Sequence, residues 1–330
     1  MYTFLNFFDI LHDQFSQRAH AYQGRKEETE MEQLPPEHPS TYFVEDRSNQ
    51  EELARLQVLD HLLTADMGGV LAEQPASAIF ERVLDVGCGT GGWLIELAQA
   101  SPSTSLLVGL DPSRTFVEYA REQARAAQVS DRVEFHVADA LRMLEFPIHF
   151  FDLVNHRAGW SWLRTWDWPK LLQEYQRVCR PGGVIRITEG DFWEGTSPAM
   201  IRLTDIFEKA LYQAGHLFHP APDGVTSELK RVLEQQGVRN VQTRSYTISH
   251  RADTPEGQHF CEVIRLGFRT IVPFLHKWTR VPEDYEAIYH QMVADMQQPD
   301  FVATMRLLTA WGTNPPRRGQ YDNTIWSDRG

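Results

Sequence analysis

The chain has 330 residues, 42% of them hydrophobic, and a formal net charge of −13 at pH 7. These values predict a folded globular protein with a substantial core, not a disordered one. The negative charge argues against a nucleic-acid partner, which would need a basic surface. No uncharged apolar run approaches membrane-spanning length, and the first residues lack a basic leader, so we expect a cytoplasmic protein with no membrane partner.

The cysteine and histidine positions give no reason to expect a disulfide or a metal. Cys88, Cys179 and Cys261 are odd in number and widely spaced, which fits neither a disulfide framework nor a paired zinc motif. His216 and His219 could offer two metal ligands, but no third ligand is evident. We therefore predict no metal site.

The N-terminal region predicts a helical strap or lid. Residues 1–23 carry apolar side chains at helical spacing, and residues 24–40 are polar and rich in proline, which is typical of a linker or mobile strap. Ser48 and Glu51 then form a capping box, which predicts the start of a helix with one leucine-rich face.

From residue 80 the pattern becomes an alternation of strands and helices, and the first strand ends in a glycine loop. The apolar run that begins at Phe80 predicts a buried strand, and helical spacing resumes at Trp93. Glycines allow a close approach of the backbone to a ligand, and the start of a helix presents free N–H groups. The loop over residues 87–92 therefore predicts a nucleotide-type ligand.

The loop alone leaves the kind of nucleotide open. Gly87, Gly89 and Gly92 satisfy the dinucleotide fingerprint, whereas the series that begins at Asp85 and runs through alternate glycines is the pattern of S-adenosylmethionine (SAM) methyltransferases. A Walker phosphate loop is excluded because no Gly-Lys-Ser/Thr follows.

Further strands follow, each attached to a polar residue or a turn. Asp111 lies about 20 residues beyond the glycines, in the place of an acid that binds ribose hydroxyls in both families. The predicted strands, in chain order, are residues 105–111 ending in Asp111, 133–137 followed by Asp139, 150–154 followed by Asn155, and 184–188 preceded by a Pro-Gly-Gly turn at 181–183. Such alternation predicts a parallel sheet with ligands beyond the carboxyl ends of its strands.

This ordered set closely resembles the class I SAM-dependent methyltransferases over about residues 80–190. Asp85, Asp139 and the Pro-Gly-Gly turn together are far more specific than a glycine triplet. The resemblance implies an α/β fold with a doubly wound, mostly parallel seven-stranded sheet and a C-terminal antiparallel strand, to which the helical strap and a helical insertion are added. It implies SAM as cofactor, S-adenosylhomocysteine as product and a small-molecule methyl acceptor.

The rest of the chain fits this layout. Helices are expected over residues 197–217 and 227–236, and antiparallel strands over 238–249 and 301–311. An insertion of two helices, about 256–275 and 282–297, separates those strands, where related enzymes commonly cover the acceptor. We therefore expect four parts: a strap or lid at 1–65, the SAM-binding core at 66–250, an acceptor cap at 251–299, and the last core strand and tail at 300–330.

The resemblance also implies which residues contact the cofactor. They are Tyr42, Asp85, Gly87, Cys88, Gly89, Asp111, Asp139, Ala140 and Asn155. The glycines would lie against the methionyl and ribose parts, Asp85 would organise the loop and the ammonium, and Asp111 would bind the ribose. Asp139 and the Ala140 N–H would meet the adenine, and the backbone at Asn155 the methionine tail. Cys88 is expected to pack rather than react, and Tyr42 either folds over the cofactor or packs as an ordinary aromatic.

The acceptor side is predicted from His156, Arg157 and the residues after them, which are expected to lie immediately beyond the fourth strand, where the resemblance implies that the methyl acceptor enters. His156 could take a proton from an acceptor hydroxyl, although a structural histidine is the alternative and an amine or carbon acceptor needs no strong base. Arg157 lies beside it. Trp160 and Trp162 are expected to contact an apolar or aromatic acceptor, with Phe268 of the insertion lining the same pocket, whereas Trp166 and Trp168 are assigned to packing.

The functional hypothesis is a methyltransferase, possibly of specialised metabolism, that acts on an O, N or C atom of a small molecule. One alternative is a NAD(P)-dependent oxidoreductase, which Gly87, Gly89, Gly92 and Asp111 would permit. The other is a non-catalytic regulatory protein that keeps a SAM fold for partner binding. The oligomeric state stays open.

Overall fold

The computed structural model describes residues 42–44 and 50–316. The expected helix at 1–23, the expected linker at 24–40 and the capping box at Ser48 lie outside the described residues, as do residues 317–330. The helix predicted after the capping box is present as α2, Gln50–Asp66.

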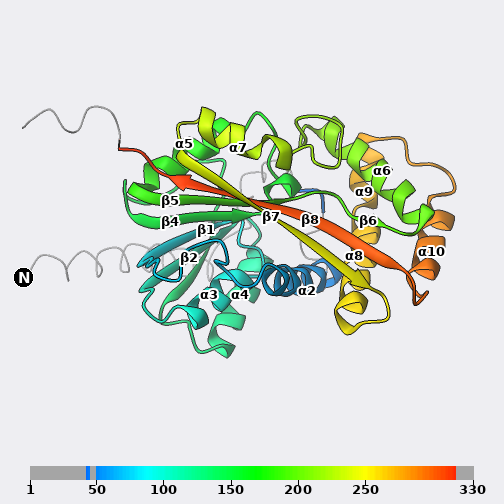
Figure 1. The fold of residues 1–330 in the computed structure, drawn as a ribbon, viewed down its shortest axis with the longest axis horizontal. Helices are drawn as coiled ribbons and strands as arrows, with labels where there is room; N and C mark the ends of the chain where they lie inside the picture. Colours follow the sequence, from blue (N-terminus) through cyan, green and yellow to red (C-terminus); the bar gives the residue numbers. More distant parts are fainter. Residues whose placement is uncertain (1–41, 45–49, 317–330) are drawn as a thin grey trace, which may run out of the picture. The chain divides into compact units, whose positions relative to one another are not determined.

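The centre of the described fold is one mixed sheet (Figure 1). Its strands are β1 Arg82–Val86, β2 Leu106–Asp111, β3 Val133–Val137, β4 Phe151–Arg157, β5 Cys179–Gly190, β6 Glu194–Gly195, β7 Arg239–Arg251 and β8 Val302–Thr313. The order is β3-β2-β1-β4-β5-β8-β6, and β7 also pairs with β8. The first five strands are parallel, and β8 is antiparallel to both β5 and β7. The predicted fold class is confirmed, with the two-residue strand β6 in addition.

Helices cover both faces of this sheet. They are α3 Gly92–Ala100, α4 Arg114–Ala126, α5 Trp168–Val178, α6 Pro198–Ala214 and α7 Thr226–Gln235. In Figure 1, α3 and α4 lie on one side of the sheet and α5 and α7 on the other. Two buried apolar clusters match this division, one under α3 and α4 and a larger one under α5, α6 and α7. The helix starts follow the sequence: the Ser113 hydroxyl accepts a hydrogen bond from the Phe116 N–H at 3.3 Å and so caps α4.

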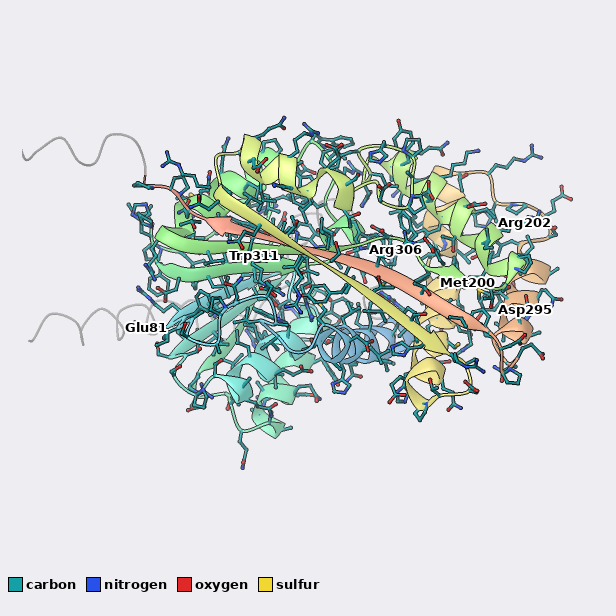
Figure 2. The ribbon with its side chains drawn as sticks, viewed as in Figure 1. Glu81, Met200, Arg202, Asp295, Arg306 and Trp311 are labelled. Atoms are coloured by element: carbon teal, nitrogen blue, oxygen red, sulfur yellow. The ribbon has the colours of Figure 1, made fainter. Side chains whose placement is uncertain are left out.

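The insertion between β7 and β8 has three helices where the periodicity predicted two. They are α8 Pro255–Thr270, α9 Val272–Trp278 and α10 Tyr285–Asp295. The first expected helix divides at Ile271, because Pro273 has no N–H to continue the ladder of α8. α8 packs against α2, and α10 packs against α6. Figure 2 labels Met200 and Asp295 near this second contact, where the Ser197 hydroxyl donates to Asp295 at 2.5 Å.

β4 is longer than predicted, which moves two candidate site residues. The expected strand ended at Val154, but β4 continues to Arg157 because its last residues pair with both neighbours. His156 lies opposite Val86 of β1 and Ile187 of β5. The expectation that His156 and Arg157 lie beyond the strand is therefore wrong.

Candidate cofactor and acceptor site

The glycine loop is held by hydrogen bonds to the end of β2. The N–H groups of Gly87 and Cys88 both donate to the Leu110 carbonyl, at 2.8 and 2.9 Å. Gly87, Gly89 and Gly91 all have positive φ, at 71°, 53° and 78°. Residues other than glycine rarely adopt this backbone conformation, so the loop needs glycine at these positions.

Two of these glycines face different surroundings. A Cβ at Gly91 would lie 2.5 Å from the Phe135 ring, so Gly91 is required by packing. A Cβ at Gly89 would meet no atom within 4 Å, so Gly89 borders open space. The loop therefore presents bare backbone to the open space at Gly89.

The Asp111 carboxylate is fixed beside that open space. One of its oxygens accepts from the Gly89 N–H at 3.1 Å, and the other accepts from the Ser113 N–H at 2.8 Å. Asp111 ends β2 and is 8% exposed. An ionised carboxylate has about four lone-pair positions and can therefore accept hydrogen bonds from several donors at once.

Asp85 is the first member of a buried polar chain. Its carboxylate accepts from the Asn155 side-chain amide at 2.7 Å, and the Asn155 carbonyl accepts from Arg186 at 2.7 Å. Arg186 in turn forms an ion pair with Glu73 at 2.7 Å. Burial raises the pKa of Asp85 to about 7, although the Asn155 hydrogen bond and the Arg186 charge act to lower it.

The remaining predicted cofactor residues surround the same edge of the sheet. Asp139 follows β3, is half-exposed, and accepts from the Leu141 N–H at 2.9 Å, while Ala140 next to it is buried. The Cys88 thiol lies under the loop, where a Cβ at Gly109 would be 2.9 Å from its sulfur. Burial, with the nearby carboxylates of Asp111 and Asp85, raises the pKa of this thiol well above its usual range.

Tyr42 points its hydroxyl at a buried ion pair. The hydroxyl donates to Glu52 and accepts from Arg55 at 3.4 Å. Glu52 and Arg55 both belong to α2, and Thr270 at the end of α8 donates to Glu52 at 3.4 Å. The cluster joins the segment 42–44 to α2 and α8.

His156 is enclosed in the core. Its side chain is fully buried, with Nδ1 2.8 Å from the Tyr175 hydroxyl and Nε2 2.9 Å from a Glu189 carboxylate oxygen. Both ring nitrogens therefore have protein partners. This arrangement matches a structural histidine, the alternative noted from the sequence.

Arg157 connects β4 to α2. Its guanidinium forms an ion pair with Asp60 and donates to the Thr64 hydroxyl at 3.1 Å. The Asp60 carboxylate also occupies the position that a Cβ at Gly92 would need. The ion pair between Arg157 and Asp60 thus holds α2 against the start of α3.

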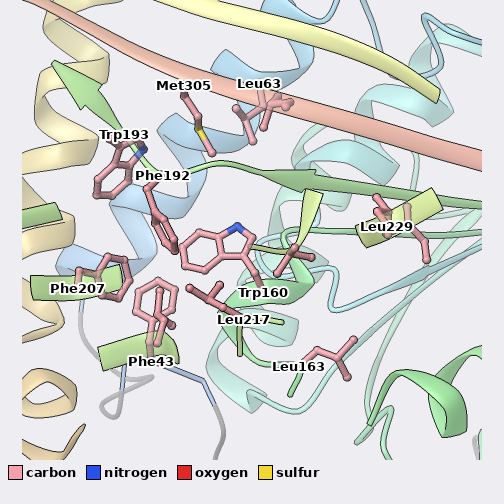
Figure 3. Close-up of a cluster of buried hydrophobic side chains, with 14 of the residues drawn as sticks. Phe43, Leu63, Trp160, Leu163, Phe192, Trp193, Phe207, Leu217, Leu229 and Met305 are labelled. Atoms are coloured by element: carbon pink, nitrogen blue, oxygen red, sulfur yellow. The ribbon is translucent and has the colours of Figure 1, made fainter. Parts of the chain in front are cut away.

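Trp160 lies in an aromatic cluster, at the centre of the view in Figure 3. Its ring stacks on Phe43 with centroids 5.4 Å apart and meets Phe192 and Phe207 edge-on at 5.6 and 6.0 Å. Trp160 is 9% exposed, and its indole N–H has no hydrogen-bond partner among the described residues. Buried N–H groups without a partner are rare in folded proteins.

Trp162 and Phe268 lie in different surroundings. Trp162 is half-buried, and its indole Nε1 is 3.1 Å from the position of a Cβ on Gly87. Phe268 is fully buried and packs edge-on against Trp193, with centroids 5.6 Å apart. The structure therefore brings Trp162 to the glycine loop but places Phe268 in the core.

The sequence reasoning missed Glu189, Arg186 and Glu73. Glu189 accepts from the backbone N–H groups of Gly159 and Trp160, at 3.0 and 3.1 Å, and so holds the turn η1 Gly159–Ser161 after β4. A signal was present, because Arg186 and Glu189 are charged residues that flank the apolar Ile187 in the buried half of β5. A buried charged residue needs a partner, so the two charges in this strand could have been recognised from the sequence as members of a buried polar site.

Two further observations apply to the described part of the chain. None of its helices is both long and apolar enough to span a bilayer. Nor do residues 42–44 and 50–316 contain a group of three His, Cys, Asp or Glu side chains able to hold a metal ion.

Comparisons with known proteins agree with this fold. The family described as "Methyltransferase domain" matches residues 83–183. A 27-O-demethylrifamycin SV methyltransferase of Amycolatopsis mediterranei is 26% identical over 80% of this chain and 83% of its own length. A demethylmenaquinone methyltransferase of Staphylococcus aureus is 29% identical over 50% of this chain and 71% of its own length.

A solved structure has the same fold. Phosphoethanolamine N-methyltransferase 2 of Haemonchus contortus, in complex with phosphomonomethylethanolamine and S-adenosylhomocysteine, aligns with a TM-score of 0.52 at 17% identity. The match covers 86% of this chain and 62% of that one, so the chain spans less than two thirds of this neighbour.

The strand order, the glycine loop and the matched domain define a class of protein. Residues 83–183 form a methyltransferase domain of the class I SAM-dependent type, as the resemblance of residues 80–190 implied. The two relatives given above are named as methyltransferases of 27-O-demethylrifamycin SV and of demethylmenaquinone.

Proposed function

We propose that this chain binds SAM along the carboxyl edge of β1, β2, β3 and β4 and transfers its methyl group to a small-molecule acceptor. The observation that supports this most directly is the Asp111 carboxylate, which is fixed beside the open side of Gly89. A rigid carboxylate next to bare backbone suits the hydroxyl pair and the body of a nucleoside.

The residues present fit SAM part by part. Asp111 would accept from the ribose hydroxyls, Asp139 from the adenine amino group, and Ala140 would meet the ring through its N–H. Asp85, beside the Asn155 backbone, would receive the ammonium of the methionine tail. The backbone of Gly87, Cys88 and Gly89 would form the surface on which the cofactor lies. Tyr42 would cover the cofactor near α2.

SAM supplies a methyl group that is already activated by a positively charged sulfur. The contribution of the chain is to position the two reactants and to exclude water. The loop and Asp111 hold the cofactor, and α2 is seated over this edge by the Arg157–Asp60 pair. We do not propose His156 as a base, because both of its nitrogens are engaged in the core.

We propose an apolar or aromatic acceptor that carries at least one oxygen. The rings of Phe43, Trp160, Phe192 and Phe207 offer an apolar surface. The Trp160 N–H, which has no partner within residues 42–44 and 50–316, would donate to an oxygen of the acceptor. Relatives named for 27-O-demethylrifamycin SV and demethylmenaquinone support a small-molecule acceptor, and specialised metabolism in the cytoplasm is the setting we propose.

Two parts of the sequence prediction enter the proposal in revised form. The helices α8 to α10 would cover the acceptor, as expected of residues 251–299. Phe268 is left out of the pocket because it is fully buried against Trp193.

Transfer of an isotope label tests the proposal. The protein is incubated with methyl-labelled SAM and a metabolite extract of the source cell, and products are identified by mass spectrometry. We expect label in a small molecule with the wild type and none with Asp111→Ala at the same SAM concentration. A folded protein that binds SAM but labels nothing would favour the regulatory alternative, and one that binds only NAD(P)H would favour the oxidoreductase.

A further inference from the structure

The sheet order places the parts of SAM in sequence along one edge, given the proposed function. Asp139 follows β3, Asp111 ends β2 and Asn155 lies near the end of β4. The order β3-β2-β1-β4 therefore runs from the adenine through the ribose to the methionine tail. In SAM the sulfur joins the ribose to that tail, so the sulfur belongs at β1, between β2 and β4.

Trp162 reaches this point from the segment that follows β4. Gly87 directly follows β1, and three consecutive atoms of the Trp162 indole lie 3.1, 3.3 and 3.4 Å from the position of a Cβ on Gly87. A Cβ on Gly87 would be closer to the indole than most real Cβ contacts, so the ring lies against the loop.

The position of Trp162 is set by buried neighbours. Its ring meets the His156 imidazole edge-on, with centroids 6.0 Å apart, and the backbone N–H of Trp162 donates to the Gly159 carbonyl at 3.0 Å. Gly159 is held in turn by Glu189, and a Cβ there would lie 2.7 Å from both Glu189 and His156. The core thus fixes the turn that presents the indole to the loop.

We propose that Trp162 is a cofactor-side residue that recognises the positive charge of the sulfonium. An aromatic ring attracts a cation at short range but has no such attraction for a neutral thioether. Trp162 would then favour SAM over S-adenosylhomocysteine and so help the product leave. This replaces the sequence prediction that Trp162 contacts the acceptor.

Calorimetric titration of both ligands tests the role of the ring. Dissociation constants for SAM and for S-adenosylhomocysteine are measured for the wild type, Trp162→Phe and Trp162→Leu. Trp166→Leu is the matched control, because Trp166 lies on the same stretch, is 60% exposed and packs over Gly215. A thermal melt of each variant establishes that it is folded.

We expect Trp162→Leu to weaken SAM binding by roughly 2- to 30-fold more than S-adenosylhomocysteine binding, the range of cation–π interactions. Trp162→Phe should show a smaller loss of selectivity and decides the matter if the leucine variant does not fold. The control should leave both constants unchanged. Equal weakening of both ligands, or no change in either, would overturn the inference. If the wild type binds neither ligand, the proposed function itself fails.

Discussion

The Glu189 carboxylate and the His156 imidazole are hydrogen bonded in the core, with Oε1 and Nε2 2.9 Å apart and both side chains fully buried. The other imidazole nitrogen meets the Tyr175 hydroxyl of α5. Glu189 also accepts from the N–H groups of Gly159 and Trp160. One carboxylate from β5 therefore positions the turn after β4, which carries both Trp160 and Trp162.

Removal of the Glu189 carboxylate should lower the stability of the folded protein. Glu189→Ala leaves two buried backbone N–H groups and one imidazole nitrogen without their partner, and we expect a loss of roughly 3–5 kcal/mol in the free energy of unfolding. Glu189→Gln keeps the volume and one acceptor oxygen, so its loss should be smaller. Urea unfolding of both variants measures the difference. A Glu189→Ala protein as stable as the wild type would show that the turn is held by other contacts.

Gly89 and Gly91 should respond differently to the same substitution. Both have positive φ, so alanine costs each of them backbone strain of about 1 kcal/mol. Gly89→Ala adds a methyl to open space, and we expect a folded protein with at least tenfold weaker SAM binding. Gly91→Ala drives the methyl against Phe135, and we expect a marked loss of thermal stability.

A thermal melt and a SAM titration of the two variants decide this comparison. Normal SAM affinity in Gly89→Ala would mean that the open side of Gly89 does not face the cofactor. Unchanged stability in Gly91→Ala would mean that the Phe135 ring moves aside without cost.

SAM binding should depend on pH through Asp85. Burial raises the pKa of this carboxyl to about 7, so it is partly protonated at neutral pH in the free protein. The SAM ammonium favours the ionised carboxylate, so binding should release a proton and should tighten as the pH rises from about 6 to 8. Calorimetry in buffers of different ionisation enthalpy measures the protons released. Asp85→Asn should bind with a flat profile, and a flat profile in the wild type would contradict the role.

The sheet and the loop could be predicted because their signals are local. The apolar run of the first strand leads into the glycine loop, and that of the second ends in a single acid. Gly89 and Asp111 could therefore be predicted from residues next to them in the sequence. The alternation of strands and helices was enough to place the candidate cofactor residues at one edge of the sheet.

What could not be predicted depends on contacts between distant residues. β4 extends to Arg157 because it pairs with β1 and β5, and a pattern of apolar residues does not contain that information. Arg186 meets Glu73, which lies 113 positions earlier, and His156 meets Glu189, 33 positions later. Because these contacts cannot be read from the sequence, His156 was predicted to lie beyond the strand, where its imidazole could act as a base.

The central claim is that Asp111 and the loop beside it bind SAM, and isothermal titration of the wild type and Asp111→Ala with SAM tests it most directly. The wild type should bind one SAM per chain and show no binding of NADH. Asp111→Ala should bind SAM about ten- to a hundredfold more weakly, a loss of roughly 1.5–3 kcal/mol, because the ribose hydroxyls lose a charge-assisted hydrogen bond. A thermal melt serves as control, since the substitution also frees the Gly89 and Ser113 N–H groups. An unchanged SAM affinity in a folded Asp111→Ala protein, or NADH binding without SAM binding in the wild type, would contradict the account.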